Sequence, residues 1–126
     1  MAVVWNDNTP IYLQLKERIV AMILDGLLKP GDAVPSVRQV AADYQLNPIT
    51  VSRAYQELAD ENVVEKRRGL GMFVTESAPQ QLLASERQQF LTHEWPAIVE
   101  RIQRLGLAWD TLRAQIDVSS NPGERS

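Results

Sequence analysis

Two short amphipathic segments, separated by only three residues, constrain the fold of this chain more than any other feature. In each segment the apolar residues recur at positions 0, 3, 4 and 7, which is the spacing of one buried helical face. The positions are Val37, Val40, Ala41 and Tyr44 in the first segment and Val51, Ala54, Tyr55 and Leu58 in the second. Gln45-Leu46-Asn47 between them is too short and too polar to be more than a turn. The sequence therefore predicts two helices with matched apolar faces, which is a helix-turn-helix arrangement.

Capping residues mark the start of each helix of this pair. Ser36 is followed three residues later by Gln39, which is the pattern of a capping box. Asn47 is an N-cap residue with Pro48 at the first helical position, where no amide hydrogen is needed. Both helices are therefore expected to begin where the apolar spacing begins.

Another helix is expected before the pair, with Thr9 as its N-cap residue and Pro10 at its first position. It should end near Gly26, ahead of a turn. Its buried stripe would consist of Ile11, Leu15, Ile19, Met22 and Ile23.

The periodicity changes after Asn62, which is expected to end the second helix of the pair in a left-handed conformation. Residues 63–66 and 72–75 have the composition of β-strands, and the loop between them contains Gly69 and Gly71. The sequence thus predicts a β-hairpin directly after the helix-turn-helix.

The net charge of −3 argues mildly against nucleic-acid binding, so the distribution of charge has to support such a function. The cations that would face DNA together are Arg38, Arg53, Lys66, Arg67 and Arg68. The outward positions at the start of the second helix of the pair carry groups suited to bases and phosphates; they are Asn47, Pro48, Ile49, Thr50, Ser52, Arg53 and Gln56. Glu57 and Glu65 are acids that do not fit this separation. A helical hairpin in a bundle core, or a solvated turn with incidental charges, would give similar patterns; we interpret the combination as a DNA-binding surface.

Catalysis and metal binding are nearly excluded by the residue types present. The chain has no cysteine and a single histidine, His93. Gly69-Leu70-Gly71 begins like a dinucleotide-binding motif, but Val74 occupies the position of the third glycine. We therefore predict no enzyme activity, no catalytic residue, no metal and no cofactor. The sequence contains no apolar run near about 18 residues and no signal-peptide start, so we expect a cytoplasmic protein without a membrane partner.

Residues 78–117 are expected to form a separate helical region after a boundary at Ser77-Ala78-Pro79. Pro96 should kink or split its long helix, and Gly106 should end it. Leu112 and Ile116 belong to a short last helix. Residues 118–126 are polar and are expected to form a disordered tail.

A heptad-type apolar seam runs through this helical region and consists of Leu91, Trp95, Ile98, Ile102 and Leu105. Two helices of one chain cannot bury such a seam, so we predict that the region forms a homodimer. The predicted interface contains the seam together with Trp109 and Leu112, and Trp95 and Trp109 would be its large anchors. The alternative is that the tryptophans pack back on the N-terminal part of the same chain.

Ordered sequence blocks occur between Pro10 and Val74: Pro10-Ile11-Tyr12-x-Gln14-Leu15, Gly26-x-x-x-Pro30-Gly31-Asp32, Pro35-Ser36-Val37-Arg38-x-Val40-Ala41, Asn47-Pro48-x-Thr50-Val51-x-Arg53-Ala54-Tyr55-x-x-Leu58 and Arg68-Gly69-x-Gly71-x-Phe73-Val74. With these blocks the chain resembles the GntR family of bacterial transcription regulators, and within it the YtrA-type subfamily with its short C-terminal region. Asn62 stands where the family usually has glycine, and Ile49 occupies a slot that is often polar.

The resemblance implies a mainly α fold with a small β-hairpin. A winged helix-turn-helix domain would occupy residues 1–77, and a helical dimerisation region would occupy residues 78–117. Arg38 would reach DNA from the first helix of the pair, and the Gly69–Gly71 loop would be the tip of the wing. The predicted DNA-binding residues are Ser36, Arg38, Asn47, Pro48, Thr50, Ser52, Arg53, Gln56, Lys66, Arg67, Arg68, Gly69 and Gly71.

The function implied is sequence-specific transcription regulation by a homodimer on a palindromic double-stranded operator. By similarity to its subfamily the protein would be a repressor of its own operon and of transporter genes. The sequence identifies no small-molecule effector. The alternative is a winged-helix module that contacts proteins and does not bind DNA sequence-specifically.

Overall fold

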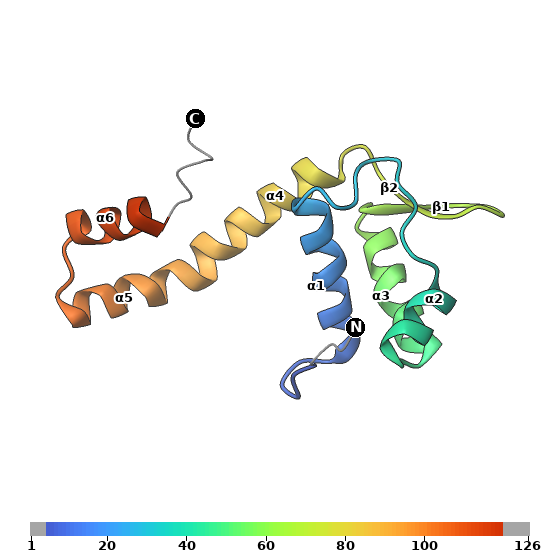
Figure 1. Ribbon diagram of the computed structural model, residues 1–126, viewed down its shortest axis with the longest axis horizontal. Coiled ribbons are helices and arrows are strands. Elements are labelled where there is room, and N and C mark those ends of the chain that lie inside the picture. Colours follow the sequence, from blue (N-terminus) through green and yellow to red (C-terminus); the bar gives the residue numbers. More distant parts are fainter. Residues whose placement is uncertain (1–4, 120–126) are drawn as a thin grey trace. The chain divides into compact units, whose positions relative to one another are not determined.

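The computed structural model describes residues 5–119 (Figure 1). Its elements in chain order are α1 (Ile11–Leu24), α2 (Val37–Tyr44), α3 (Pro48–Asp60), β1 (Val64–Arg67), β2 (Gly71–Val74), α4 (Ala78–Gln89), the π-helical turn η1 (Phe90–Glu94), α5 (Trp95–Leu105) and α6 (Trp109–Ser119). The chain divides into two compact units, of which the first ends at Ser85 and the second begins at Glu86. The expectation of a mainly α fold with a small β-hairpin is confirmed.

The first unit is built around the packing of α1 on α3, which lie side by side (Figure 1). All four predicted apolar positions of α3 are buried, and α2 adds Val40 and Ala41. The buried residues of α1 are Leu15, Ile19 and Ile23, whereas Ile11 is 37% exposed. Ala78 and Leu82 in α4 also belong to this core, beyond the expected domain end at residue 77. The core therefore includes the first turns of α4.

Side-chain caps form before α2 and α3 as predicted. Ser36 Oγ accepts a hydrogen bond from the Gln39 amide at 3.0 Å. Asn47 Oδ1 accepts one from the Ile49 amide at 2.9 Å. The Gln39 side chain bonds to Asp43 instead of returning to Ser36, so only half of the capping box forms. The start of α3 is therefore fixed by a side-chain cap of its own.

The start of α1 differs from the prediction. Pro10 occupies the cap position, the helix begins at Ile11, and Thr9 gives no side-chain cap. The preceding turn is held by Asn6, whose side chain accepts a hydrogen bond from the Thr9 amide at 3.1 Å. Gln14 donates to the backbone carbonyls of Asn6 and Thr9. These bonds satisfy the backbone of the turn without a threonine cap.

Strands β1 and β2 form an antiparallel hairpin, the wing hairpin. The paired positions run from Val64 and Val74 to Arg67 and Gly71. Compared with the expected ranges 63–66 and 72–75, β1 lies one residue later and β2 one residue earlier. The hairpin closes at its base because the Thr75 hydroxyl donates to the Asn62 carbonyl at 2.8 Å. Asn62 has the expected left-handed conformation, with φ 62°.

In the second unit, η1 immediately precedes α5, and Pro96 lies in the first turn of α5. Proline has no amide hydrogen and its ring clashes with the carbonyl four residues earlier, so the α-helical ladder is interrupted there. A wider π turn accommodates the interruption. Gly106 ends α5 with φ 67°, as expected.

Helix α6 extends to Ser119, so the first two residues of the expected tail, 118–126, are helical. The rest of that segment, 120–126, lies outside the described residues. Within residues 5–119, no helix combines the length and the apolar character needed to cross a membrane.

Candidate nucleic-acid interface

One side of α3 faces solvent along the helix. This exposed stripe consists of Ile49, Ser52, Arg53 and Gln56. Its members are spaced as i, i+3, i+4 and i+7 and lie opposite the buried face of the helix. Among the other residues predicted to contact DNA from this helix, Asn47 and Pro48 are exposed and Thr50 is half-buried. The stripe presents a hydroxyl, a guanidinium, an amide and one aliphatic side chain.

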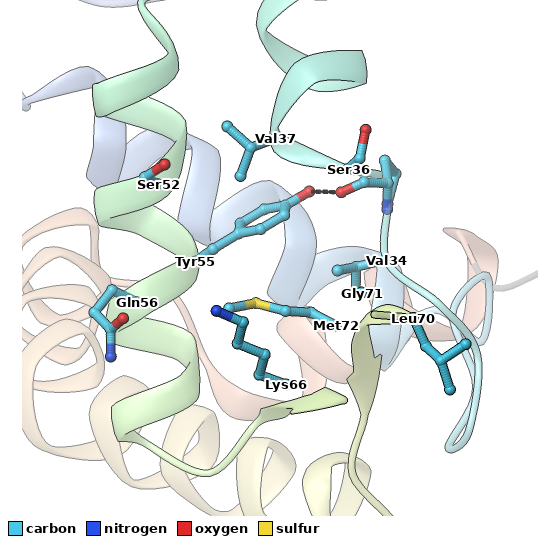
Figure 2. A pocket seen from close by; sticks show the side chains of 11 residues that line it. Val34, Ser36, Val37, Ser52, Tyr55, Gln56, Lys66, Leu70, Gly71 and Met72 are labelled. Atoms are coloured by element: carbon cyan, nitrogen blue, oxygen red, sulfur yellow. Dashed lines mark hydrogen bonds between the residues drawn. The ribbon is translucent and has the colours of Figure 1, made fainter. Parts of the chain in front are cut away.

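A hollow of about 400 Å³ lies beside this stripe, between α3, the segment leading into α2 and the wing hairpin (Figure 2). Predicted DNA-binding residues in its lining are Ser36, Ser52, Gln56, Lys66 and Gly71. Apolar side chains of Val34, Val37 and Met72 complete much of the wall. Figure 2 shows Lys66 extending from β1 toward α3. The fold thus brings together polar groups from three segments that are separate in the sequence.

Tyr55 connects α3 to the segment that leads into α2. Its ring is buried, and its hydroxyl donates to the Pro35 carbonyl at 2.5 Å (Figure 2). Burial raises the pKa of Tyr55, with a further contribution from Tyr44, so the hydroxyl remains a donor. This bond fixes the segment that carries Ser36 relative to α3. Sequence reasoning had placed Tyr55 in the core and missed this second role.

The Arg53 guanidinium packs against the ring of Tyr12 in α1. Its Cζ lies 3.8 Å from the centroid of the Tyr12 ring, and its Nε lies 4.0 Å from a carboxylate oxygen of Glu57. The Arg53 side chain is nevertheless 63% exposed. A cation–π contact of this kind holds an arginine in one direction, so Arg53 is a positioned cation at the edge of the stripe.

Two acids at the C-terminal end of α3, Glu57 and Glu61, are paired with a lysine of α1. Lys16 Nζ lies 3.2 Å from Glu57 Oε1 and also contacts Glu61. Burial alone would lower the pKa of Lys16, but its bonds to Glu61 and Glu57 raise it, so the lysine stays charged. On the wing, Glu65 lies 3.8 Å from Arg67. Both acids that seemed out of place in the sequence therefore have a cationic neighbour.

The remaining predicted cations lie on exposed positions of α2 and the wing. Arg38 is exposed in the first turn of α2. Lys66 and Arg68 are exposed on the wing, and Arg67 Cζ lies 4.3 Å from the centroid of the Phe73 ring. The wing tip turns through Gly69 and Gly71, whose φ values of 77° and 110° are unfavourable for other residues. Of these residues, Lys66 and Gly71 belong to the lining of the hollow and the others do not.

Four of the seven residues predicted to dimerise are exposed on the second unit. Leu91 and Leu105 are each 59% exposed, Trp109 is 55% exposed and Ile98 is 39% exposed. Trp95, Ile102 and Leu112 are half-buried. Phe90, Leu107 and Ile116, which sequence reasoning did not select for an interface, are also exposed.

Known proteins share both the sequence and the fold. Residues 11–74 match the family described as bacterial regulatory proteins, gntR family. The HTH-type transcriptional repressor YtrA of Bacillus subtilis is 44% identical over 72 residues, which cover 57% of this chain and 55% of YtrA, about half of that relative's length. The uncharacterised HTH-type transcriptional regulator YhcF of Bacillus subtilis is 33% identical over 120 residues, which cover 94% of this chain and 97% of YhcF.

Among solved structures, a GntR family transcriptional regulator from Listeria monocytogenes has a TM-score of 0.74 at 28% identity, covering 92% of this chain and 100% of that chain. The family match spans half of this chain and includes all three helices and the hairpin of the winged domain. The expected resemblance to YtrA-type regulators is confirmed by these relatives. The chain therefore belongs to the GntR family of bacterial regulatory proteins and has a winged helix-turn-helix DNA-binding domain; the relatives that it matches are transcription regulators, not enzymes.

Proposed function

We propose that this protein is a repressor that binds a palindromic operator sequence-specifically as a homodimer, and that it controls its own operon and transporter genes. The observation that carries the proposal is the exposed stripe of α3 beside the cationic wing hairpin. Helix-turn-helix proteins place the N-terminal residues of this helix against base edges in the major groove. Membership of the family and the repressor activity in the name of YtrA support the regulatory role.

In this proposal, the hydroxyl of Ser52 and the amide of Gln56 contact base edges by hydrogen bonds. Arg38 reaches a guanine or a phosphate from α2 with its forked guanidinium. Arg53, which leans on Tyr12, contacts the phosphate backbone at the edge of the groove. The division of roles follows the geometry, since the polar groups of the stripe point outward and Arg53 is held to one side.

The wing hairpin supplies the cations that neutralise the adjacent phosphates. Lys66, Arg67 and Arg68 are exposed there, and Gly69 and Gly71 leave the tip narrow. Since the whole chain carries a net charge of −3, non-specific attraction to DNA is weak and the binding depends on these local contacts. Affinity should therefore fall steeply as salt is raised.

Dimerisation is assigned to the apolar residues of the second unit. Fully burying one large apolar side chain contributes about 1.5–3 kcal/mol. An exposed surface that contains Leu91, Leu105 and Trp109 is typical of an interface. A two-fold dimer also matches the symmetry of a palindromic operator.

Titration of the protein's own upstream DNA tests the proposal, with fluorescence anisotropy at two stated salt concentrations. A fragment with an inverted repeat should bind about 10³-fold or more tightly than a shuffled fragment of the same length. Sedimentation of the complex should give two chains per operator. Equal affinity for both fragments would contradict sequence-specific regulation and would favour a module for protein–protein contact.

A further inference from the structure

Ile49 is an aliphatic side chain on a surface stripe that is otherwise polar. It is 75% exposed, more than any other large apolar side chain of residues 5–119. Single exposed apolar residues are common on protein surfaces, so exposure alone carries no argument. What distinguishes Ile49 is its position, because Ser52 and Arg53 lie three and four residues further along the same stripe.

The side chain of Ile49 is held in a defined direction at the start of the recognition helix. Ile49 is the second residue of α3, and its amide is bound by Asn47 Oδ1 at 2.9 Å. The side chain is β-branched, which leaves one strongly preferred χ1 rotamer in a helix. The branch at its Cβ therefore has one preferred direction in the turn that meets base edges when such a helix enters the major groove.

An aliphatic side chain can recognise one feature of the major groove favourably. Base pairs present hydrogen-bond donors and acceptors there, and thymine adds a C5-methyl group. Isoleucine has no polar side-chain atom, so pressing it against a polar base edge would remove water from that edge without replacing the hydrogen bond. A thymine methyl group is the partner that gains from the contact, because both surfaces are apolar.

We propose that Ile49 is a specificity-determining residue that contacts the C5-methyl group of one thymine in each half-site of the operator. The inference rests on the proposed function, namely that α3 reads DNA. It assigns an apolar contact to the first turn of α3 and hydrogen-bonded contacts to Ser52 and Gln56 in the following turns. The operator should therefore contain a thymine at one fixed position whose methyl group matters.

The experiment is a double-mutant cycle between the side chain and the methyl group, using the full chain. The operator is first obtained by selection from random double-stranded DNA. Each thymine of the half-site is then replaced by deoxyuridine, which removes only the C5-methyl group, in both half-sites at once. Wild type and Ile49→Ala are titrated against every DNA at one salt concentration.

At one thymine position, the wild type should lose about fourfold in affinity per half-site, or about fifteenfold for the doubly substituted operator. Ile49→Ala should bind the thymine-containing operator more weakly than the wild type does. Replacing the thymine at that position by deoxyuridine should not weaken its binding further. Ile49→Val, which keeps the branched methyl groups nearest the helix, should retain part of the sensitivity. Leu27→Ala is the matched control, since Leu27 is 70% exposed and lies outside the proposed interface.

Equal losses for wild type and Ile49→Ala at every deoxyuridine position would overturn the inference and leave the proposed function intact. The inference is also overturned, with the proposed function intact, if deoxyuridine weakens binding of the wild type at no thymine of the selected half-site. If the folded wild type selects no DNA sequence at all, the proposed function and the inference both fail. Circular dichroism identifies misfolded variants, and none is expected because alanine is a better helix former than isoleucine at an exposed position.

Discussion

The two units of this chain differ in whether their apolar residues form a closed core. In the first unit, Leu15 and Leu58 are at most 1% exposed and pack in a closed core. In the second unit, Leu91, Leu105 and Trp109 are each more than half exposed. The first unit therefore has a core within one chain, whereas the second unit has exposed large apolar residues of the kind found at interfaces. In the proposed homodimer, a second copy of the chain covers them.

The largest effect is expected when the same truncation is made in the two units. Leu58→Ala should lower the free energy of unfolding of the first unit by about 2–5 kcal/mol, because it leaves a cavity in a packed core. Leu105→Ala should change the stability of the first unit by less than about 0.5 kcal/mol, because Leu105 lies in the second unit and is not part of this core. Hydrogen exchange of the α3 amides measures this stability for the first unit alone. Similar effects of the two substitutions would remove the contrast between the units.

Substitutions of the exposed apolar residues of the second unit should change dimerisation and not the stability of the first unit. Trp109→Ala should raise the dimer dissociation constant by about thirtyfold or more, because a large aromatic anchor is lost from the interface. Sedimentation equilibrium over a range of protein concentrations measures the constant. Gln103→Ala, at an exposed polar position of α5, is the control. A monomeric wild type, or an unchanged constant for Trp109→Ala, would show that this surface has another role.

DNA binding should depend on the first unit and be most sensitive to its exposed cations. Arg38→Ala should weaken binding to the specific operator by about 1–3 kcal/mol without unfolding the domain. Arg87→Ala, which removes an exposed arginine of α4 outside the proposed interface, should have little effect. Anisotropy titrations at one salt concentration compare the two. Equal losses would mean that net charge matters and that the position of Arg38 does not.

A smaller effect is expected at the hydrogen bond between Tyr55 and Pro35. Tyr55→Phe should lower the free energy of unfolding by about 0.5–1.5 kcal/mol. Burial raises the pKa of Tyr55 above its ordinary value of 10.0, so its stabilising contribution is complete below that pH and is lost as the pH rises further. Urea unfolding at neutral pH and above pH 10.0 should therefore show that the free energy of unfolding falls more in wild type than in Tyr55→Phe. Lys16, whose pKa is also raised, contributes equally to both proteins.

The sequence was sufficient to predict the helices and turns that depend on residues close together in the chain. The apolar spacing in α2 and α3 and the caps at Ser36 and Asn47 depend on residues at most a few positions apart, and both helices form where expected. The same rules place the left-handed Asn62 and the hairpin to within one residue. The α1 start was predicted less well, because Gln14 and Asn6 bond across eight positions and make a cap at Thr9 unnecessary.

The contacts that shape the interface were beyond sequence reasoning. The Tyr55 bond to Pro35 spans 20 positions, and the Lys16 bond to Glu57 spans 41. Such pairings require the packed arrangement of α1, α2 and α3, which no local pattern specifies. Gln45 ends α2 with a φ of 55°, a left-handed conformation that residues other than glycine adopt rarely and without a reliable sequence signal. Arg53 was predicted to face outward, but only the position of Tyr12 gives its direction.

The proposal that the second unit forms the dimer is tested by sedimentation equilibrium of two proteins, the full chain and the chain truncated after Ser85. This cut keeps Ala78 and Leu82, which a cut at residue 77 would remove from the core. We expect the truncated chain to be folded and monomeric and the full chain to be a dimer. The truncated chain should also lose the avidity of two linked domains on a full operator, a factor of about 10²–10⁴. A truncated chain that remains dimeric would contradict the division into a self-sufficient DNA-binding unit and a dimerising one.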